Sequence, residues 1–140
     1  MKGKMKKIIV SIIVLIIGAL GFVTIRLAQE GFDIRVENET NKEVSGLYLT
    51  YDNIKSDINI PSIASGEKYT LNVNQNEDSN NDFSEAALKL EYKDNKGNLH
   101  TEYLIGYFEK GYTGKAVVNI KSIDENGKLE VEIKNHTSVY

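Results

Sequence analysis

The sequence predicts an all-β domain, a two-sheet sandwich of about seven to eight antiparallel strands, preceded by one N-terminal transmembrane helix. Three observations predict this architecture. Residues 8–25 form an apolar run without a charge. From residue 32 onward the apolar residues recur with a period of two, which is typical of half-buried strands. These runs are short and are separated by turn residues rather than by stretches with a helical period.

The chain opens with four lysines within residues 1–7, followed by the apolar segment Ile8–Ile25. A helix of this length rises about 27 Å, close to the roughly 30 Å of a bilayer core. The lysines before the segment predict that the N-terminus is cytoplasmic. We therefore expect a basic cytoplasmic start at 1–7, a transmembrane anchor at 8–28 and an extracytoplasmic β domain at 29–140.

Two alternatives compete with the anchor. A secretory signal peptide cleaved at the small residues Ala19 and Gly21 would release the same domain as a secreted protein. The apolar residues Phe22, Val23 and Ile25 continue past that site and favour the anchor. A buried core helix is disfavoured, because the rest of the chain is not apolar enough to surround it.

Charge and cysteine content exclude several classes. After Arg26 the chain carries 12 Lys and Arg against 20 Asp and Glu, a net of −8. A surface of this sign repels phosphate backbones, so we expect no nucleic-acid partner. The absence of cysteine excludes disulfides, thiolate zinc sites, thiol nucleophiles and a lipidated cysteine.

The first half of the domain contains four predicted strands. Residues 32–37 alternate apolar and polar side chains, and residues 44–52 repeat the pattern. Ile58–Ile60 is a short run ended by Pro61, which suits an edge strand. Residues 63–73 contain a Ser-Gly turn followed by a fourth alternating run. The expected core faces are Phe32, Ile34 and Val36; Leu47, Leu49 and Tyr51; and Tyr69, Leu71 and Val73.

The second half contains two predicted hairpins. Residues 88–92 and 99–108 flank the turn Asp94–Gly97. Residues 116–123 and 128–134 flank Asp124–Gly127, where glycine can adopt the positive φ that the turn needs. These runs complete the sandwich; a partly open barrel is the alternative.

The layout resembles small single-pass exported proteins of Gram-positive bacteria that carry an immunoglobulin-like domain. The stretch Ile60–Val73, IPSIASGEKYTLNV, is similar to the segment of bacterial immunoglobulin-like accessory domains in which a Pro/Gly loop precedes an alternating strand. The resemblance implies an immunoglobulin-like sandwich. It is one of class only, and it carries no functional residues to this chain.

The polar segment 74–85 is a candidate cation site. Oxygen-bearing side chains fall at positions one, three, five, seven, nine and twelve, which is the ligand spacing of a calcium loop. These residues are Asn74, Asn76, Asp78, Asn80, Asp82 and Glu85. Ser79 stands where the loop needs glycine, so we favour a solvated, flexible inter-strand loop. Calcium is the one cofactor with any support.

An aromatic-rich strip at residues 103–112 is the second candidate. We expect Tyr103 and Tyr107 to pack in the core, since they share a predicted strand face with Ile105. The alternative is that they form an apolar platform for a peptide, glycan or lipid headgroup. Tyr112 lies in the glycine-bounded loop 111–114, where a contact role is more plausible. Tyr112 and Phe108 are the interaction candidates.

The sequence contains no constellation that points to catalysis. His100 is expected to be an exposed strand residue, and neither a nucleophile elbow nor an HExxH pattern occurs. We therefore expect a binding protein rather than an enzyme.

The leading hypothesis is an interaction module held at the bilayer by Ile8–Ile25, with an unidentified membrane or cell-envelope protein as partner. The stalk Leu27–Gly31 spans at most about 17 Å, so the partner should lie close to the membrane. An envelope-complex accessory and an immunity-type protein both fit. The alternative is binding or sensing of a small ligand or of calcium.

Overall fold

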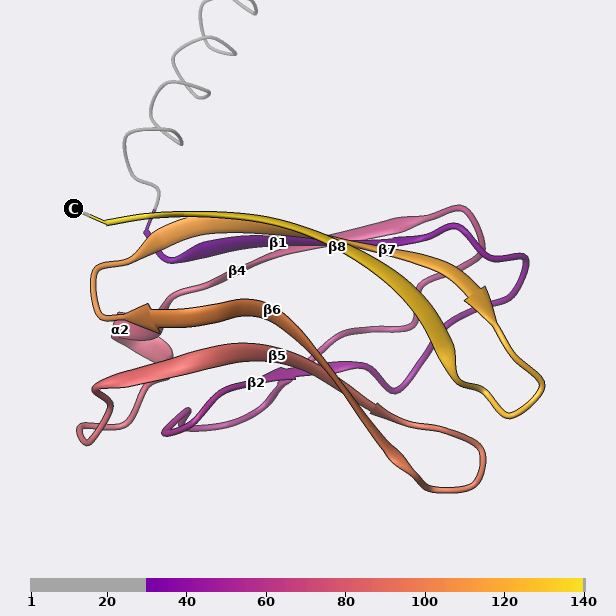
Figure 1. The fold of residues 1–140 in the computed structure, drawn as a ribbon, viewed down its shortest axis with the longest axis horizontal. Coiled ribbons are helices and arrows are strands. Elements are labelled where there is room, and N and C mark those ends of the chain that lie inside the picture. Colours follow the sequence, from indigo (N-terminus) through magenta and orange to yellow (C-terminus); the bar gives the residue numbers. More distant parts are fainter. Residues whose placement is uncertain (1–29, 140) are drawn as a thin grey trace, which may run out of the picture.

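The computed structural model describes residues 30–139, which form two packed four-stranded sheets and one short helix (Figure 1). This confirms the prediction of an all-β sandwich. The elements are β1 (Phe32–Asn38), β2 (Tyr48–Thr50), β3 (Ile58–Asn59), β4 (Lys68–Val73), α2 (Gln75–Asp78), β5 (Glu85–Lys93), β6 (Leu99–Glu109), β7 (Thr113–Ile123) and β8 (Leu129–Ser138).

The expected transmembrane anchor lies outside the described residues. Among residues 30–139, no helix has the length and apolar character needed to cross a membrane.

The strand order is β4-β1-β7-β8 in one sheet and β3-β2-β5-β6 in the other. β1 pairs antiparallel with β4 but parallel with β7. The expectation of wholly antiparallel strands was therefore wrong at β1–β7, a non-local contact whose direction no local pattern specifies. In an immunoglobulin constant domain the first strand pairs with the second. Here β1 lies between β4 and β7, and β2 belongs to the other sheet, so the strand order differs.

Local sequence patterns predicted most strand ends correctly. β3 ends just before Ile60 and Pro61 and lies at a sheet edge, as predicted. Both predicted hairpins form, and Gly97 and Gly127 adopt φ of 82° and 80° in their turns. β2 is shorter than expected, because Val44 makes only an isolated bridge to Ile63.

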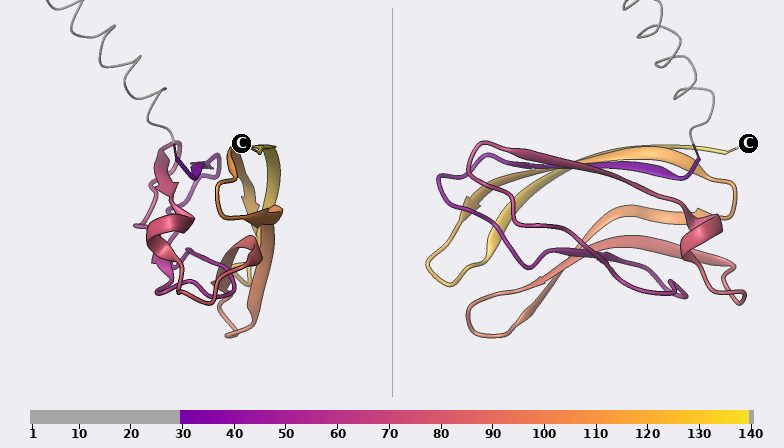
Figure 2. Two further views of the ribbon diagram at one scale, coloured as in Figure 1. Left: turned by 90° about the vertical axis from the view of Figure 1, so that its left-hand side faces the viewer. Right: turned by 180° about the vertical axis from the view of Figure 1, so that it is seen from behind.

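The two opposite ends of the sandwich bring different elements together (Figure 2). At one end, here called the α2 end, α2 lies beside the β6–β7 turn, the start of β1 and the end of β8. At the other, here called the hairpin end, the β5–β6 and β7–β8 turns meet, since the Asn95 amide donates to the Asn126 carbonyl (2.8 Å).

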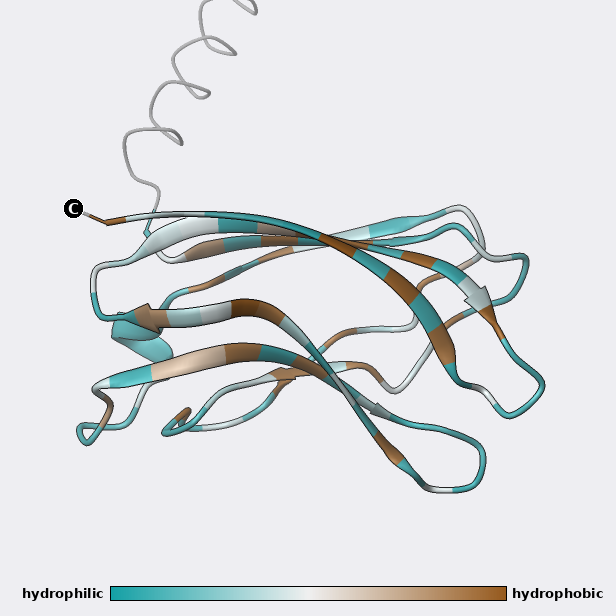
Figure 3. Cartoon of the chain, viewed as in Figure 1, coloured by the Kyte–Doolittle hydropathy of each residue, from teal (hydrophilic) through white to brown (hydrophobic). Residues whose placement is uncertain are grey.

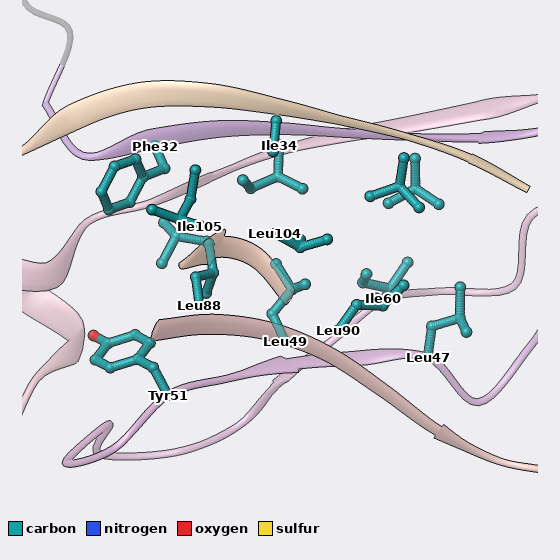
Figure 4. Packing of buried hydrophobic residues seen from close by; sticks show 14 of the residues in the cluster. Phe32, Ile34, Leu47, Leu49, Tyr51, Ile60, Leu88, Leu90, Leu104 and Ile105 are labelled. Atoms are coloured by element: carbon teal, nitrogen blue, oxygen red, sulfur yellow. The ribbon is translucent and has the colours of Figure 1, made fainter. Parts of the chain in front are cut away.

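The core fills the space between the sheets (Figure 4). Phe32, Ile34 and Val36 of β1 are fully buried, as the alternation predicted. Leu88 and Leu90 of β5 face them from the opposite sheet. Figure 3 shows the same alternation of hydrophobic and hydrophilic residues along the strands, whereas α2 is hydrophilic.

Polar contacts close the hairpin end. The Leu129 amide donates to Tyr92 Oη across the two sheets (2.8 Å). His100 stacks on the Tyr92 ring and lies 2.9 Å from the Asp94 carboxylate. This contact, with hydrogen bonds from Asn98, holds the pKa of Asp94 well below its usual range. His100 is therefore partly buried in a structural contact, not an exposed strand residue as expected.

Phe108 is the centre of an aromatic cluster at the α2 end. Its ring lies 5.1 Å from Phe32, 5.2 Å from Tyr51 and 5.5 Å from Phe83, measured between centroids. Its side chain is 0% exposed. The proposal of Phe108 as an interaction residue was therefore wrong, because its ring is enclosed by the core.

We expect Phe108→Ala to lower the free energy of unfolding by about 3–5 kcal/mol, because it leaves a cavity among three aromatic rings. The matched control is Tyr103→Ala, on the same strand but facing solvent, which should cost no more than about 0.5 kcal/mol. Urea unfolding followed by circular dichroism measures both. Equal losses for the two variants would contradict the assignment of Phe108 to the core.

Candidate contact site at the α2 end

Two extra residues in β6 determine which of its side chains face solvent. Three steps along β5, from Ala86 to Lys89, lie opposite five steps along β6, from Phe108 to Tyr103. Such bulges break the strict alternation of a strand. Leu104 and Ile105 are consequently both buried.

The bulges turn the β6 tyrosines outward. Tyr103 is 61% exposed and Tyr107 is 48% exposed, so the prediction that they pack in the core was wrong. Strict alternation would have placed both beside Ile105. β6 is also the edge strand of its sheet, so these rings lie at an accessible border of the sandwich.

Tyr107 lies between two carboxylates. Glu85 and Glu109 are direct cross-strand partners, a placement of like charges that is unfavourable. The Tyr107 hydroxyl contacts both, Glu109 most closely and Glu85 at 3.1 Å. The hydrogen bond to Glu109 and partial desolvation raise the pKa of Tyr107 above its ordinary value. Neither carboxylate forms an ion pair within residues 30–139.

Tyr112 continues this surface beyond the end of β6. It is half-buried, and its ring packs edge-on against Tyr107 with centroids 6.1 Å apart. We name Tyr107, Tyr112, Glu85 and Glu109 the tyrosine–glutamate surface. Tyr103 lies further along the same strand.

The α2 helix supports the turn that carries Tyr112. Gln75 is buried, and its Nε2 donates to the carbonyls of Tyr112 (2.6 Å) and Glu109 (3.3 Å). Asn74 caps the helix by accepting from the Asn76 amide (3.0 Å). At the C-terminal end of α2, the Lys55 amide donates to the Asp78 carbonyl (2.7 Å).

The six residues proposed as calcium ligands take up separate positions. Asn74 caps α2, and the Asp78 carboxylate accepts from the Asn74 amide (3.2 Å). Asn80 donates to the Ile54 carbonyl, while Glu85 accepts from Tyr107. Asn76 and Asp82 are exposed. Within residues 30–139, no group of three or more His, Cys, Asp or Glu is placed to hold a metal ion.

The expectation of a solvated, flexible loop at residues 74–85 was wrong in part. The segment contains α2, and Gln75, Ser79 and Phe83 are buried. Two signals pointed to this order. Asn74 is followed three residues later by Glu77, the spacing of a helix N-terminal cap box, and Phe83 is a single large apolar residue in a polar stretch. Gly106 likewise signalled a bulge within β6.

No protein-family model matches the sequence, and no curated protein matches it. Among solved structures, the chain is similar to a protein from Eubacterium rectale determined by NMR, with 20% sequence identity. The match covers 75% of this chain and 89% of that one, with a TM-score of 0.41. A likeness at this level assigns no function to the chain.

The environment of Tyr107 gives a spectroscopic prediction. Its phenol should stay protonated at a pH of about 10, where an unperturbed tyrosine is half ionised. Glu109→Gln removes the neighbouring charge that disfavours the phenolate, so it should lower the pKa of Tyr107 toward that ordinary value. An NMR titration of tyrosine ring carbons measures the shift, with Glu67→Gln as the distant control. A Tyr107 titration unchanged by Glu109→Gln would contradict the contact.

Proposed function

We propose that this chain is a membrane-anchored, extracytoplasmic interaction module that binds a positively charged segment of a membrane or cell-envelope protein through the tyrosine–glutamate surface. The observation that carries the proposal is the position of the Tyr107 hydroxyl, on the edge strand β6, between the carboxylates of Glu85 and Glu109. Neither carboxylate forms an ion pair within residues 30–139. Binding, rather than catalysis, is the role proposed.

The proposed location rests on the N-terminal sequence. Four lysines precede the apolar run Ile8–Ile25, and a stalk of a few residues follows it. The described chain begins at Glu30, beside the α2 end. The tyrosine–glutamate surface lies at that same end, so a short stalk would keep it close to the bilayer.

Aromatic exposure supports a contact role for this surface. Tyrosine is enriched at protein interfaces because its ring buries a large apolar area while the hydroxyl keeps a polar partner. Tyr107 is 48% exposed, and Tyr112 packs against it. A partner covering both rings would bury apolar surface that now faces solvent.

Charge indicates the kind of partner. One phenolic proton cannot satisfy both Glu85 and Glu109, and residues 30–139 supply no ion pair to either. A lysine or arginine from a partner would relieve the repulsion between them and form charge-assisted hydrogen bonds. The −8 net charge of the chain after Arg26 favours encounter with such a partner.

Two alternatives have less support. A calcium sensor built on residues 74–85 would have to free Asn74 and Asp78 from the cap of α2. A cleaved, secreted form would keep the same contact surface. We also propose that the domain is immunoglobulin-like in the broad sense of two packed sheets. The biological roles that we propose for it are an accessory protein of an envelope complex and an immunity-type protein.

Site-specific photocrosslinking in intact cells tests the proposal. A benzophenone amino acid at Tyr107 should give a discrete adduct, whereas one at Val117, on the opposite sheet, should not. Protease added to intact protoplasts should digest that adduct, because the domain is outside the membrane. Absence of an adduct, equal adducts at both positions, or full protection from protease would each contradict the proposal.

A further inference from the structure

Three of the four edge strands in the described part of the chain are protected against pairing. Proteins protect such edges because an open one is a template for another chain. β3 has only two residues and Pro61 follows it closely. β6 is bulged, and β8 is tied to β6, where Asn135 Nδ2 donates to the Leu104 carbonyl (2.7 Å). The fourth edge, β4, has six residues in unbroken register with β1 and contains neither a proline nor a bulge.

The backbone of β4 directs hydrogen-bonding groups away from its sheet. The Asn38 amide donates to the Glu67 carbonyl (2.9 Å), so the even-numbered residues of β1 bond toward β4. In the β1–β4 register, these residues lie opposite the odd-numbered residues of β4. The amides and carbonyls of Lys68, Thr70 and Asn72 therefore point outward, and within residues 30–139 no strand lies beyond them.

The side chains of β4 leave apolar area uncovered at the same edge. Tyr69 lies opposite Val36, and Leu71 lies opposite Ile34. Val36 and Ile34 are fully buried, whereas Tyr69 and Leu71 pack against the core but are only half-buried. A further strand beside β4 would cover both side chains.

The sequence of β4 is complementary to a second copy of itself. Antiparallel pairing about a two-fold axis at Thr70 sets Thr70 opposite Thr70, a favourable cross-strand pair. It also sets Lys68 opposite Asn72 and Tyr69 opposite Leu71. Lys68 is the only charged residue of β4, so no like charges lie directly opposite each other. Elsewhere, the net charge of −8 after Arg26 disfavours contact between two copies.

The surroundings of β4 favour Thr70 as the residue on the axis. This axis uses only the outward backbone groups of β4, whereas an axis one residue later would need the Asn74 amide. That amide already donates to the Asp78 carboxylate (3.2 Å). The Thr70 axis also places Lys68 two strands, or about 10 Å, from Asp33 of the second copy. Opposite charges across the interface then favour this register.

We propose that two copies of this chain pair through β4, so that their β4-β1-β7-β8 sheets become one continuous sheet. β4 and β3 lie on the side of the sandwich opposite to β6 and β8 (Figure 2). Pairing through β4 therefore leaves the tyrosine–glutamate surface open. The pairing does not depend on the function proposed above.

Cysteine cross-linking tests the pairing, because the chain has no cysteine of its own. The full-length Thr70→Cys variant would be treated with a short bismaleimide in membranes of the producing cells. A cross-linked dimer should be the main product, since the Cα atoms of such a pair lie about 5.5 Å apart. The matched control is Thr101→Cys, an exposed threonine of the edge strand β6, which should remain monomeric.

A proline variant tests whether backbone hydrogen bonds hold the two copies together. The reporter is the double variant Lys68→Cys and Asn72→Cys, whose cysteines are about 13 Å apart within one copy and meet only across the axis. Adding Thr70→Pro should lower its cross-linking about fivefold or more, because proline removes an outward N–H. The β1–β4 bonds stay intact, so the urea midpoint should change little. Thr70→Lys, which sets two lysines opposite each other, should have the same effect.

Three results would overturn the proposal. The first is a Thr70→Cys variant that stays monomeric or joins a different protein instead. The second is equal cross-linking of Thr101→Cys, which would show only that copies are crowded. The third is cross-linking of the double variant that neither Thr70→Pro nor Thr70→Lys reduces. The Tyr107 adduct is measured separately, so the interaction proposal and the pairing can fail independently.

Discussion

The irregularity of β6 is the constraint on which both the core and the surface of the α2 end depend. Its two extra residues send Leu104, Ile105 and Phe108 inward and leave Tyr103 and Tyr107 outside. A regular strand in this position would bury tyrosine rings and leave leucine in solvent. Bulges also make an edge strand a poor template for pairing with other chains. β6 can therefore carry exposed aromatic rings without offering a long, regular edge for aggregation.

The aromatic cluster packs β6 against the other segments of the α2 end. Phe108 contacts Phe32 of β1, Tyr51 after β2 and Phe83 before β5, so four segments distant in sequence share one packed centre. Tyr51 also shares a buried hydrogen bond with Ser79 (2.8 Å), the residue that follows α2. Tertiary packing must hold a helix of four residues, because so short a helix is not stable alone. The support of the Tyr112 turn by Gln75 follows from that packing.

The regular elements of the fold could be predicted from the sequence, whereas the irregular ones could not. Period-two alternation located the buried face of β1, and the glycine turns located both hairpins, because each depends only on neighbouring residues. The parallel contact between β1 and β7 depends on residues far apart in the chain. The β6 bulges depend on fitting Leu104 and Ile105 into a core that the local pattern does not describe. Of the candidate site, the sequence singled out Tyr112 but missed the pairing of Glu85 with Glu109, which only the strand register shows.

Hydrogen–deuterium exchange tests whether the α2 end is the surface that this protein presents to a partner. The full-length chain would be compared in membranes of the producing cells and after purification in detergent. We expect slower exchange in the native membranes over the β6–β7 turn, Glu109–Thr113, and no change at the hairpin turn Asp124–Gly127. Identical exchange of the β6–β7 turn in both preparations, or slowing confined to the hairpin end, would contradict it.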